Sequence, residues 1–330
     1  MNEIATKEMK SDRVMELFFR LIKGESLSVQ RLADEYHVST RSITRDINSL
    51  KSFLADHRET LGYAELEYSS SNHCYRLKLE HFLTNKELLV ITKILIGSRA
   101  LNHTDLLEII RKLKLNTSTN DREQLEQLIH NELYHYSEIG SDCKSILDHI
   151  WKLTECIHNR NMITISYYKM NRELVKRRIK PASILFSEYY FYLIAYKTEE
   201  DTGIPYYFRI DRITSITIHR ETYTLAPSER INEGELRKKS QFMWPGPERH
   251  IRFAFSGPSV QAILDRIPTA RVIDYVNDEA IIEADVYGEG IRMFLLSQGS
   301  WVRVLAPESF AKEMKQEIEK MMAQYQNISI

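Results

Sequence analysis

Residues 28–55, SVQRLADEYHVSTRSITRDINSLKSFLA, decide the fold of the N-terminal part of this chain. Apolar residues recur there at helical spacing in two runs, Val29, Leu32, Ala33 and Tyr36, then Ile43, Ile47, Leu50 and Leu54. Between the runs, Val38 can fill the corner of a tight turn and the Ser39 hydroxyl can cap the second helix. The stretch therefore predicts two amphipathic helices joined by a short turn, the arrangement of a helix-turn-helix.

The outward positions at the start of the second predicted helix carry short or forked hydrogen-bonding side chains. Groups of this kind contact base edges and phosphates when a helix enters a major groove. We therefore expect this helix to read double-stranded DNA, through Ser39, Thr40, Arg41, Ser42, Thr44, Arg45 and Asn48. The pattern alone is also compatible with a helix pair whose polar side chains are simply solvated.

The residues from Val38 to Leu50 fit the pattern V-S-x-R-x-I-x-R-D-I-x-x-L. This pattern resembles the recognition half of the winged helix-turn-helix family of bacterial transcription regulators. Two strand-like pieces follow at 64–68 and 75–79, joined by serine and asparagine residues that favour a turn. We expect them to form the wing, which would lie along the phosphate backbone. An apolar stripe from Val14 to Ile22 predicts a preceding helix that starts at Ser11 or Asp12.

Length and composition are those of an ordinary globular protein. A chain of 330 residues suggests two or three domains, and its 43% hydrophobic and 28% charged residues suffice for packed cores. The formal net charge of -1 means that any nucleic-acid binding must come from local patches. The three cysteines form no CxxC pair, and no run of about 18 apolar residues occurs. We therefore expect a cytoplasmic location, with no membrane contact and no export.

Residues 84–150 have helical spacing of their apolar residues. Thr84 and Glu87 form a plausible capping box at the start, and a polar break at 116–121 separates two of the predicted helices. The segment could bridge two domains, form a dimer interface, or serve as a simple spacer, and the sequence leaves these alternatives open.

The period changes after residue 146, where short runs rich in Ile, Tyr and Phe alternate with polar turns. This pattern predicts a small, strongly bent antiparallel sheet or barrel. Residues 177–196, RRIKPASILFSEYYFYLIAY, and 206–216, YYFRIDRITSI, resemble the WYL domain family. Phe191, Tyr192 and Leu193 stand at the Trp-Tyr-Leu triplet, and Tyr206 replaces an arginine that is frequent in the family.

The resemblance to WYL domains implies a module that senses a nucleotide or a single-stranded nucleic acid. By match to the family pattern, the expected effector-binding residues are Tyr192, Arg209 and Arg212, followed by Arg178 and Ser183. Strand alternation would place Arg209 and Asp211 on one face, opposite Phe208 and Ile210. Guanidinium groups grip phosphates and aromatic faces stack on bases, which suits such a ligand. An internal ion-pair network of Arg209, Asp211 and Arg212 is the structural alternative.

After a charged, loop-like stretch at 228–248, the remaining residues predict a last domain. Its elements are a strand at 251–255, a helix at 259–266, strands at 271–275 and 280–286, a helix at 290–298, a strand at 301–305 and a helix at 309–325. This β-α-β-β-α-β order with an added helix is ferredoxin-like. It resembles the extension that commonly follows a WYL domain. The glycines of YGEG at 287–290 are most simply a strand-to-helix turn.

Together these features predict an α+β multidomain protein. We expect a winged helix-turn-helix at 1–82, a helical linker or dimerisation region at 83–145, a small Sm/SH3-like β-barrel (WYL) at 146–227, a linker at 228–248 and a ferredoxin-like C-terminal domain at 249–330. The resemblances imply a homodimeric regulator, a repressor rather than an activator, on a pseudo-palindromic operator. The alternative is an accessory subunit or enzyme of nucleic-acid processing. We find no catalytic signature and expect no metal and no cofactor.

Overall fold

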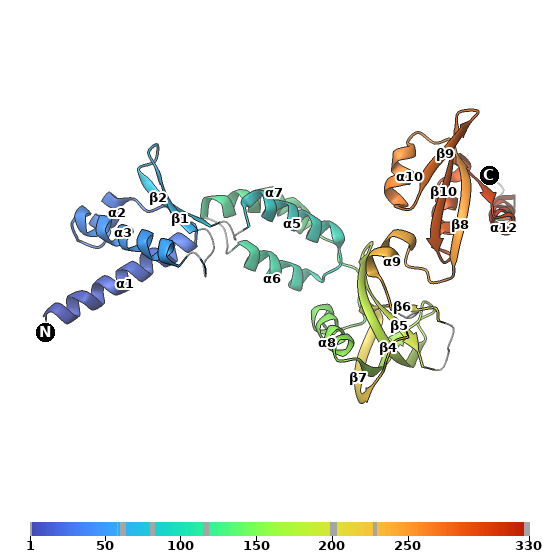
Figure 1. Cartoon of the computed structure of the whole chain (residues 1–330), viewed down its shortest axis with the longest axis horizontal. Helices are drawn as coiled ribbons and strands as arrows, with labels where there is room; N and C mark the ends of the chain where they lie inside the picture. Colours follow the sequence, from blue (N-terminus) through green and yellow to red (C-terminus); the bar gives the residue numbers. More distant parts are fainter. Residues whose placement is uncertain are drawn as a thin grey trace. The chain divides into compact units, whose positions relative to one another are not determined.

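The computed structural model describes residues 2–57, 59, 64–79, 83–114, 119–198, 203–226 and 230–326. The chain divides into two compact units, Met1–Ile139 and Gly140–Ile330. Each unit mixes elements of different kinds, whose order along the chain can be followed in Figure 1. None of the helices in the described ranges is both long enough and apolar enough to cross a membrane.

The first unit begins with three helices and a β-hairpin, which are α1 (Asn2–Ile22), α2 (Val29–Glu35), α3 (Thr40–Asp56), β1 (Ala64–Ser69) and β2 (Cys74–Leu79). The predicted helix pair and the antiparallel hairpin are both confirmed. Helix α1 starts about nine residues earlier than the sequence predicted, because residues 2–10 contain good helix formers and neither glycine nor proline.

One apolar core joins these elements. Leu17 and Leu21 of α1 pack with Leu32 of α2 and with Ile43 and Ile47 of α3, and all five side chains are almost fully buried. These are the positions of the helical stripes read from the sequence. The core therefore fixes which face of α3 turns outward.

Three further helices complete the first unit, namely α5 (Asn85–Ser98), α6 (His103–Lys114) and α7 (Thr119–Tyr134), and α5 contacts both of the others. The predicted capping box is present, since the Thr84 hydroxyl accepts a hydrogen bond from the Glu87 backbone and the Glu87 carboxylate accepts one from the Thr84 backbone. The polar break predicted at 116–121 is too long, because α7 already begins at Thr119; residues 115–118 lie outside the described ranges.

The second unit opens with helix α8 (Ile146–His158) and a five-stranded antiparallel sheet. Its strands are β3 (Asn161–Tyr168), β4 (Leu174–Ser187), β5 (Tyr190–Lys197), β6 (Tyr206–Arg209) and β7 (Ile213–Thr222), in the order β6-β5-β4-β3-β7. A short 3₁₀ turn, η1 (Ile210–Arg212), joins β6 to β7. The long strand β4 pairs with β3 along one half and with β5 along the other, and its register shifts between Pro181 and Ser183. Proline cannot donate a ladder hydrogen bond, which accounts for a bulge at this point.

A second, four-stranded antiparallel sheet lies near the C-terminus (Figure 1). Its elements are β8 (Glu248–Phe255), α10 (Val260–Arg266), β9 (Arg271–Val276), β10 (Glu279–Tyr287), α11 (Gly290–Ser297), β11 (Val302–Ala306) and α12 (Glu308–Gln326), and the strand order is β11-β8-β10-β9. The predicted β-α-β-β-α-β order with an added helix is confirmed. Phe253 of β8, Ile282 of β10 and Phe310 of α12 are fully buried in its core.

The stretch between the two sheets differs from the predicted charged loop. Residues Glu233–Lys239 form a short helix, α9, whose N-cap Asn232 accepts a hydrogen bond from the backbone of Glu235 at 3.1 Å. Leu236 of α9 and the following Met243 are buried against Leu185 and Ile194 of the five-stranded sheet. The prediction was wrong because Leu236 is the one apolar residue of α9, EGELRKK, so the sequence shows no apolar stripe.

After α9, the chain lies directly against the turn between β10 and α11. A side-chain carbon at Gly290 would come within 1.7 Å of the Gln241 carbonyl oxygen, and one at Gly288 within 2.1 Å of the Trp244 carbonyl oxygen. Gly288 also has a φ of +68°, which L side chains rarely adopt. The glycine pair is a strand-to-helix turn, as predicted, and it also admits this close backbone contact.

Candidate nucleic-acid interface and effector site

Helix α3 turns its polar side outward. Thr40, Arg41, Thr44, Arg45 and Asn48 are exposed, as is the preceding Ser39, and Ser42 is half-buried. Within the described ranges, the side chains of Arg41, Arg45 and Asn48 form no hydrogen bond or ion pair. Free, exposed guanidinium and amide groups on one helix face are available to phosphates and base edges.

The start of α3 is held by its cap and by the turn before it. The Ser39 hydroxyl accepts a hydrogen bond from the Ser42 backbone at 3.3 Å and lies 3.0 Å from the Ser42 hydroxyl. His37 has a φ of 53°, which turns the chain sharply between α2 and α3, and Val38 packs against the core. Ser39 and Ser42 therefore already cap the helix, whereas the arginines beyond them have no such internal role.

A buried ion pair positions α3 from behind. Asp46 lies on the inner face of the helix and is fully buried, and its Oδ2 accepts a hydrogen bond from Arg13 Nε of α1 at 2.7 Å. A second nitrogen of the same guanidinium lies 2.6 Å from this oxygen. A buried carboxylate without this partner would be costly, so the pair ties the angle of α3 to that of α1.

The wing is tied to the helical part through its backbone. Leu27 and Tyr75 exchange two backbone hydrogen bonds of 2.8 Å, and Arg76 donates a hydrogen bond to the Ser26 hydroxyl at 2.8 Å. Lys51 of α3 lies 4.7 Å from the centre of the Tyr75 ring. The hairpin is thereby fixed beside the C-terminal half of α3, with the serines of its tip exposed or half-buried.

In the second unit, the structure brings three of the five predicted effector residues together. Tyr192 of β5 pairs in register with Arg209 of β6, and the positive charge of Arg212 is close enough to act on the Tyr192 phenol. The Arg209 guanidinium lies 3.4 Å from the centre of the Tyr190 ring. Tyr190 was not among the predicted effector residues; its place two residues from Tyr192, on the same face of the strand, was the available signal.

The predicted strand through Asp211 is wrong at its end. Strand β6 stops at Arg209, and the 3₁₀ turn that follows brings the Asp211 carboxylate back to the Arg209 guanidinium. The two groups form a bidentate pair with distances of 3.1 and 2.6 Å. The internal ion pair considered as an alternative therefore exists for Arg209. Arg212 is half-buried and forms no hydrogen bond or ion pair with any described residue.

Burial raises the pKa of Tyr192 to about 12, and the charges of Arg209 and Arg212 act in the opposite direction. The phenol is therefore neutral at physiological pH and can donate a hydrogen bond. A half-buried donor beside two guanidinium groups and the Tyr190 ring is an arrangement that can bind an aromatic, anionic ligand.

The other two predicted effector residues already have protein partners. Arg178 of β4 forms an ion pair with Glu221 of β7. Ser183 is buried, and its hydroxyl donates a hydrogen bond to Glu233 of α9 at 2.7 Å. Helix α9 thus covers Ser183, which could not be foreseen because α9 itself was not predicted.

Metal binding finds no support in the part of the chain that the structure describes. There, no three His, Cys, Asp or Glu side chains are grouped so that they could hold a metal ion.

The sequence matches two domain families. Residues 13–58 match an HTH domain, and residues 148–218 match a WYL domain. Both resemblances read from the sequence are thereby confirmed, and together they indicate a DNA-binding regulator. No curated protein matches the chain.

Two solved structures show distant likeness to the chain. Proteasome accessory factor B/C (PafBC) of Arthrobacter aurescens is 16% identical with a TM-score of 0.28, over 96% of this chain and 49% of that protein, so the chain spans about half its length. A CRISPR Cas-related protein is also 16% identical, with a TM-score of 0.37 over 76% of each chain. Neither likeness is strong enough to support an argument about function.

Proposed function

We propose that the chain, which carries an HTH domain followed by a WYL domain, is a sequence-specific transcription regulator. Its affinity for DNA would depend on an effector bound in the WYL region. The observation that supports DNA binding is the exposed face of α3, where the side chains of Arg41, Arg45 and Asn48 have no partner among the residues that the structure describes. We propose that the regulator represses transcription of its target genes and that it is located in the cytoplasm. A reporter gene whose expression falls when the regulator is deleted would contradict repression.

The proposed DNA contacts divide into two kinds. Arg41, Thr44, Arg45 and Asn48 project from the exposed face of α3 and would reach base edges, whereas Ser39, Thr40 and Ser42 lie at the helix start, where backbone N–H groups favour a phosphate. The buried pair of Arg13 and Asp46 would fix the angle at which this face meets the groove.

The DNA half can be tested by gel-shift titration of Arg41→Ala and Arg45→Ala against the wild type. Each variant should lose roughly 1–3 kcal/mol of affinity for a selected operator. Arg111→Ala is the matched control, because it removes an equally exposed arginine from α6. Unchanged affinity in both α3 variants would refute the proposal, and magnesium-dependent cleavage of the DNA would favour the processing alternative.

The proposed effector is a nucleotide or a single-stranded nucleic acid. Its base would stack on Tyr190 or Tyr192, and its phosphate would bind Arg212, the arginine of this cluster that has no described partner. Arg209 would contribute while it remains paired with Asp211. Arg178 and Ser183 would join the site only by exchanging Glu221 and Glu233 for the ligand.

We further propose a homodimer on a pseudo-palindromic operator, with the two recognition helices about 34 Å apart. Exposed apolar side chains on two elements support self-association. Val90 and Ile94 of α5 are 57% and 65% exposed, and Met322 and Tyr325 of α12 are 57% and 71% exposed. A monomeric mass in light scattering, with and without operator DNA, would contradict the dimer.

The finer fold assignments are also proposals. The strand order β6-β5-β4-β3-β7 with a 3₁₀ turn before the last strand supports an Sm/SH3-like barrel, and the order β11-β8-β10-β9 supports a ferredoxin-like domain. The proposed domains remain 1–82, 83–145, 146–227, 228–248 and 249–330. Limited proteolysis that cuts inside one of these segments first would argue against the division.

A further inference from the structure

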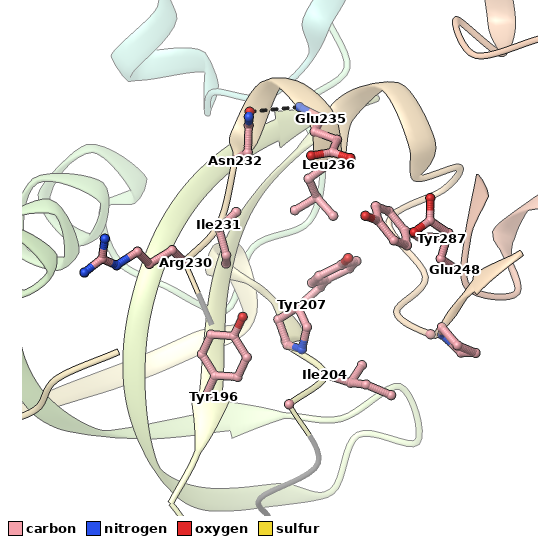
Figure 2. Close-up of a pocket in the computed structure, with 14 residues that line it drawn as sticks. Tyr196, Ile204, Tyr207, Arg230, Ile231, Asn232, Glu235, Leu236, Glu248 and Tyr287 are labelled. Carbon is pink, nitrogen blue, oxygen red and sulfur yellow. Dashed lines mark hydrogen bonds between the residues drawn. The ribbon is translucent and has the colours of Figure 1, made fainter. Parts of the chain in front are cut away.

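A cavity of about 310 Å³ lies where the five-stranded sheet, the α9 segment and the C-terminal sheet meet. Figure 2 shows the rings of Tyr196, Tyr207 and Tyr287 around it, together with the side chains of Ile231 and Leu236. The size is at the lower end of the range for small-molecule sites in proteins. None of the five residues proposed for effector binding lines this cavity.

One end of the cavity is acidic. Glu235 of α9 and Glu248 of β8 both line it, and both hold the ammonium group of Lys239, at 2.8 and 2.5 Å. The same ammonium lies 5.2 Å from the centre of the Tyr287 ring. In the structure itself, this corner therefore already binds an alkylammonium group with two carboxylates and an aromatic face.

The two carboxylates at this corner could bind a second positive charge in addition to Lys239. Two carboxylates face one ammonium, which leaves a local charge of -1, and the second oxygen of each carboxylate forms no hydrogen bond within the described ranges. Arg230 is the cationic residue among those that line the cavity, but it is exposed and its guanidinium points away from the tyrosine rings (Figure 2).

We propose that this cavity binds a small organic cation, a protonated amine or quaternary ammonium group on an apolar or aromatic body. The charged group would lie beside the free oxygens of Glu235 and Glu248 and against the face of Tyr287, and the body would pack on Tyr196, Tyr207 and Leu236. Cations are attracted to aromatic faces, and the side chains of Glu235 and Glu248 are both 49% exposed, so a cation can reach them from solvent. A phosphate-bearing ligand is disfavoured by the same carboxylates, so this site has the opposite charge preference to the cluster of Arg209 and Arg212.

The walls of the cavity explain how such a ligand would affect the second unit. Tyr196 and Tyr207 belong to the five-stranded sheet, Leu236 to α9, and Tyr287 to the C-terminal sheet. A ligand that touches all three stabilises the arrangement in which they are together, by an amount set by its differential affinity. The site is independent of DNA binding, so its test does not depend on the proposed regulator function.

The experiment compares three probes of similar shape on the full-length protein at neutral pH, namely benzylamine, benzyl alcohol and benzoate. Binding is measured by isothermal titration calorimetry and by ligand-observed NMR. We expect benzylamine to bind at least about 10-fold more tightly than benzyl alcohol, and benzoate to bind most weakly. Equal binding of the amine and the alcohol, preference for benzoate, or no binding of benzylamine at about 10 mM would each overturn the proposal.

Variants locate the binding. Glu248→Gln keeps the shape of the side chain and removes its charge, and Tyr287→Leu removes the ring, so each should abolish most of the preference for the amine. Glu319→Gln on α12 is the matched control, because it removes an exposed carboxylate outside the cavity and should change nothing. Thermal unfolding of each variant shows whether it is folded. Unchanged amine binding in folded Glu248→Gln and Tyr287→Leu would place the probe elsewhere and refute the assignment.

Discussion

The carboxylate of Asp46 differs from every other polar group of α3, because it lies on the buried face of the helix. Arg13 supplies two of its contacts, and its second oxygen has no hydrogen-bond partner among the described residues. The recognition helix is therefore held by a charge pair as well as by aliphatic packing. In the sequence, Asp46 stood within the matched pattern, but nothing there identified Arg13 as its partner, 33 residues away.

Replacement of Arg13 by alanine should strongly destabilise the first unit. The change leaves Asp46 as a buried carboxylate without a counter-ion, which costs about 3–5 kcal/mol. The free energy of unfolding in urea measures the effect. The double variant Arg13→Ala, Asp46→Ala should be less destabilised than the sum of the two single changes, and a cost near zero for Arg13→Ala would show that the pair is unimportant.

His149 of α8 should make the second unit sensitive to mild acid. Its ring is half-buried, and burial lowers its pKa, with a further decrease from the nearby charge of Lys152. Because the unfolded chain then binds a proton more readily than the folded one, stability is full above the ordinary histidine pKa of about 6.5 and is lost as pH falls through the lowered value. Thermal unfolding between about pH 7.5 and 5 should show this slope, and His149→Gln should reduce it. Identical slopes in the two proteins would exclude His149 as the cause.

Among the helices and strands, the periodicity of the sequence correctly located those that carry a regular series of apolar residues. Helix α3 and most of the C-terminal elements were placed within one to three residues, since their sequences carry several apolar residues that are buried or half-buried in the core. Helix α9 was missed because Leu236 is its one apolar residue, and the strand end at Arg209 was missed because an ion pair between residues two apart closes the turn. Three predicted effector residues came together, while Ser183 was covered by the element that the sequence did not reveal.

The close contact at Gly290 should make that position intolerant of any side chain. In Gly290→Ala, the new carbon would meet the Gln241 carbonyl oxygen at 1.7 Å, so the backbone must move and the C-terminal sheet should lose several kcal/mol of stability. Gly97→Ala in α5 is the control, because nothing lies within 4 Å and alanine is the better helix former by about 1 kcal/mol. Thermal unfolding should show a lower midpoint for the first variant and an equal or higher one for the second. Similar midpoints would mean that the contact is not maintained in solution.

At the scale of the whole molecule, the proposed function requires that the two units influence each other's ligands. If a nucleotide or oligonucleotide changes the affinity for operator DNA by some factor, DNA must change the affinity for that effector by the same factor. Fluorescence anisotropy, with labelled operator in one titration and labelled effector in the other, measures both. Arg212→Ala should weaken effector binding about 10-fold and leave the affinity for DNA without effector unchanged, and Arg220→Ala is the control. Two unequal factors, or no effect of any nucleotide tested, would contradict effector control.

The close packing of residues 241–247 against the β10–α11 turn also limits where domain boundaries can be placed in truncated or chimeric proteins. A boundary placed by composition at Pro247 would separate the glycine turn from the backbone that packs on it. A boundary ahead of Asn232 would keep that contact but remove Leu236 and Met243 from Leu185 and Ile194 of the five-stranded sheet. Chimeras that borrow the C-terminal sheet should therefore also carry α9 and the five-stranded sheet, with the junction near Gly140, where the second unit begins. A boundary chosen from the prolines at 245 and 247 would separate segments that pack against each other within one unit.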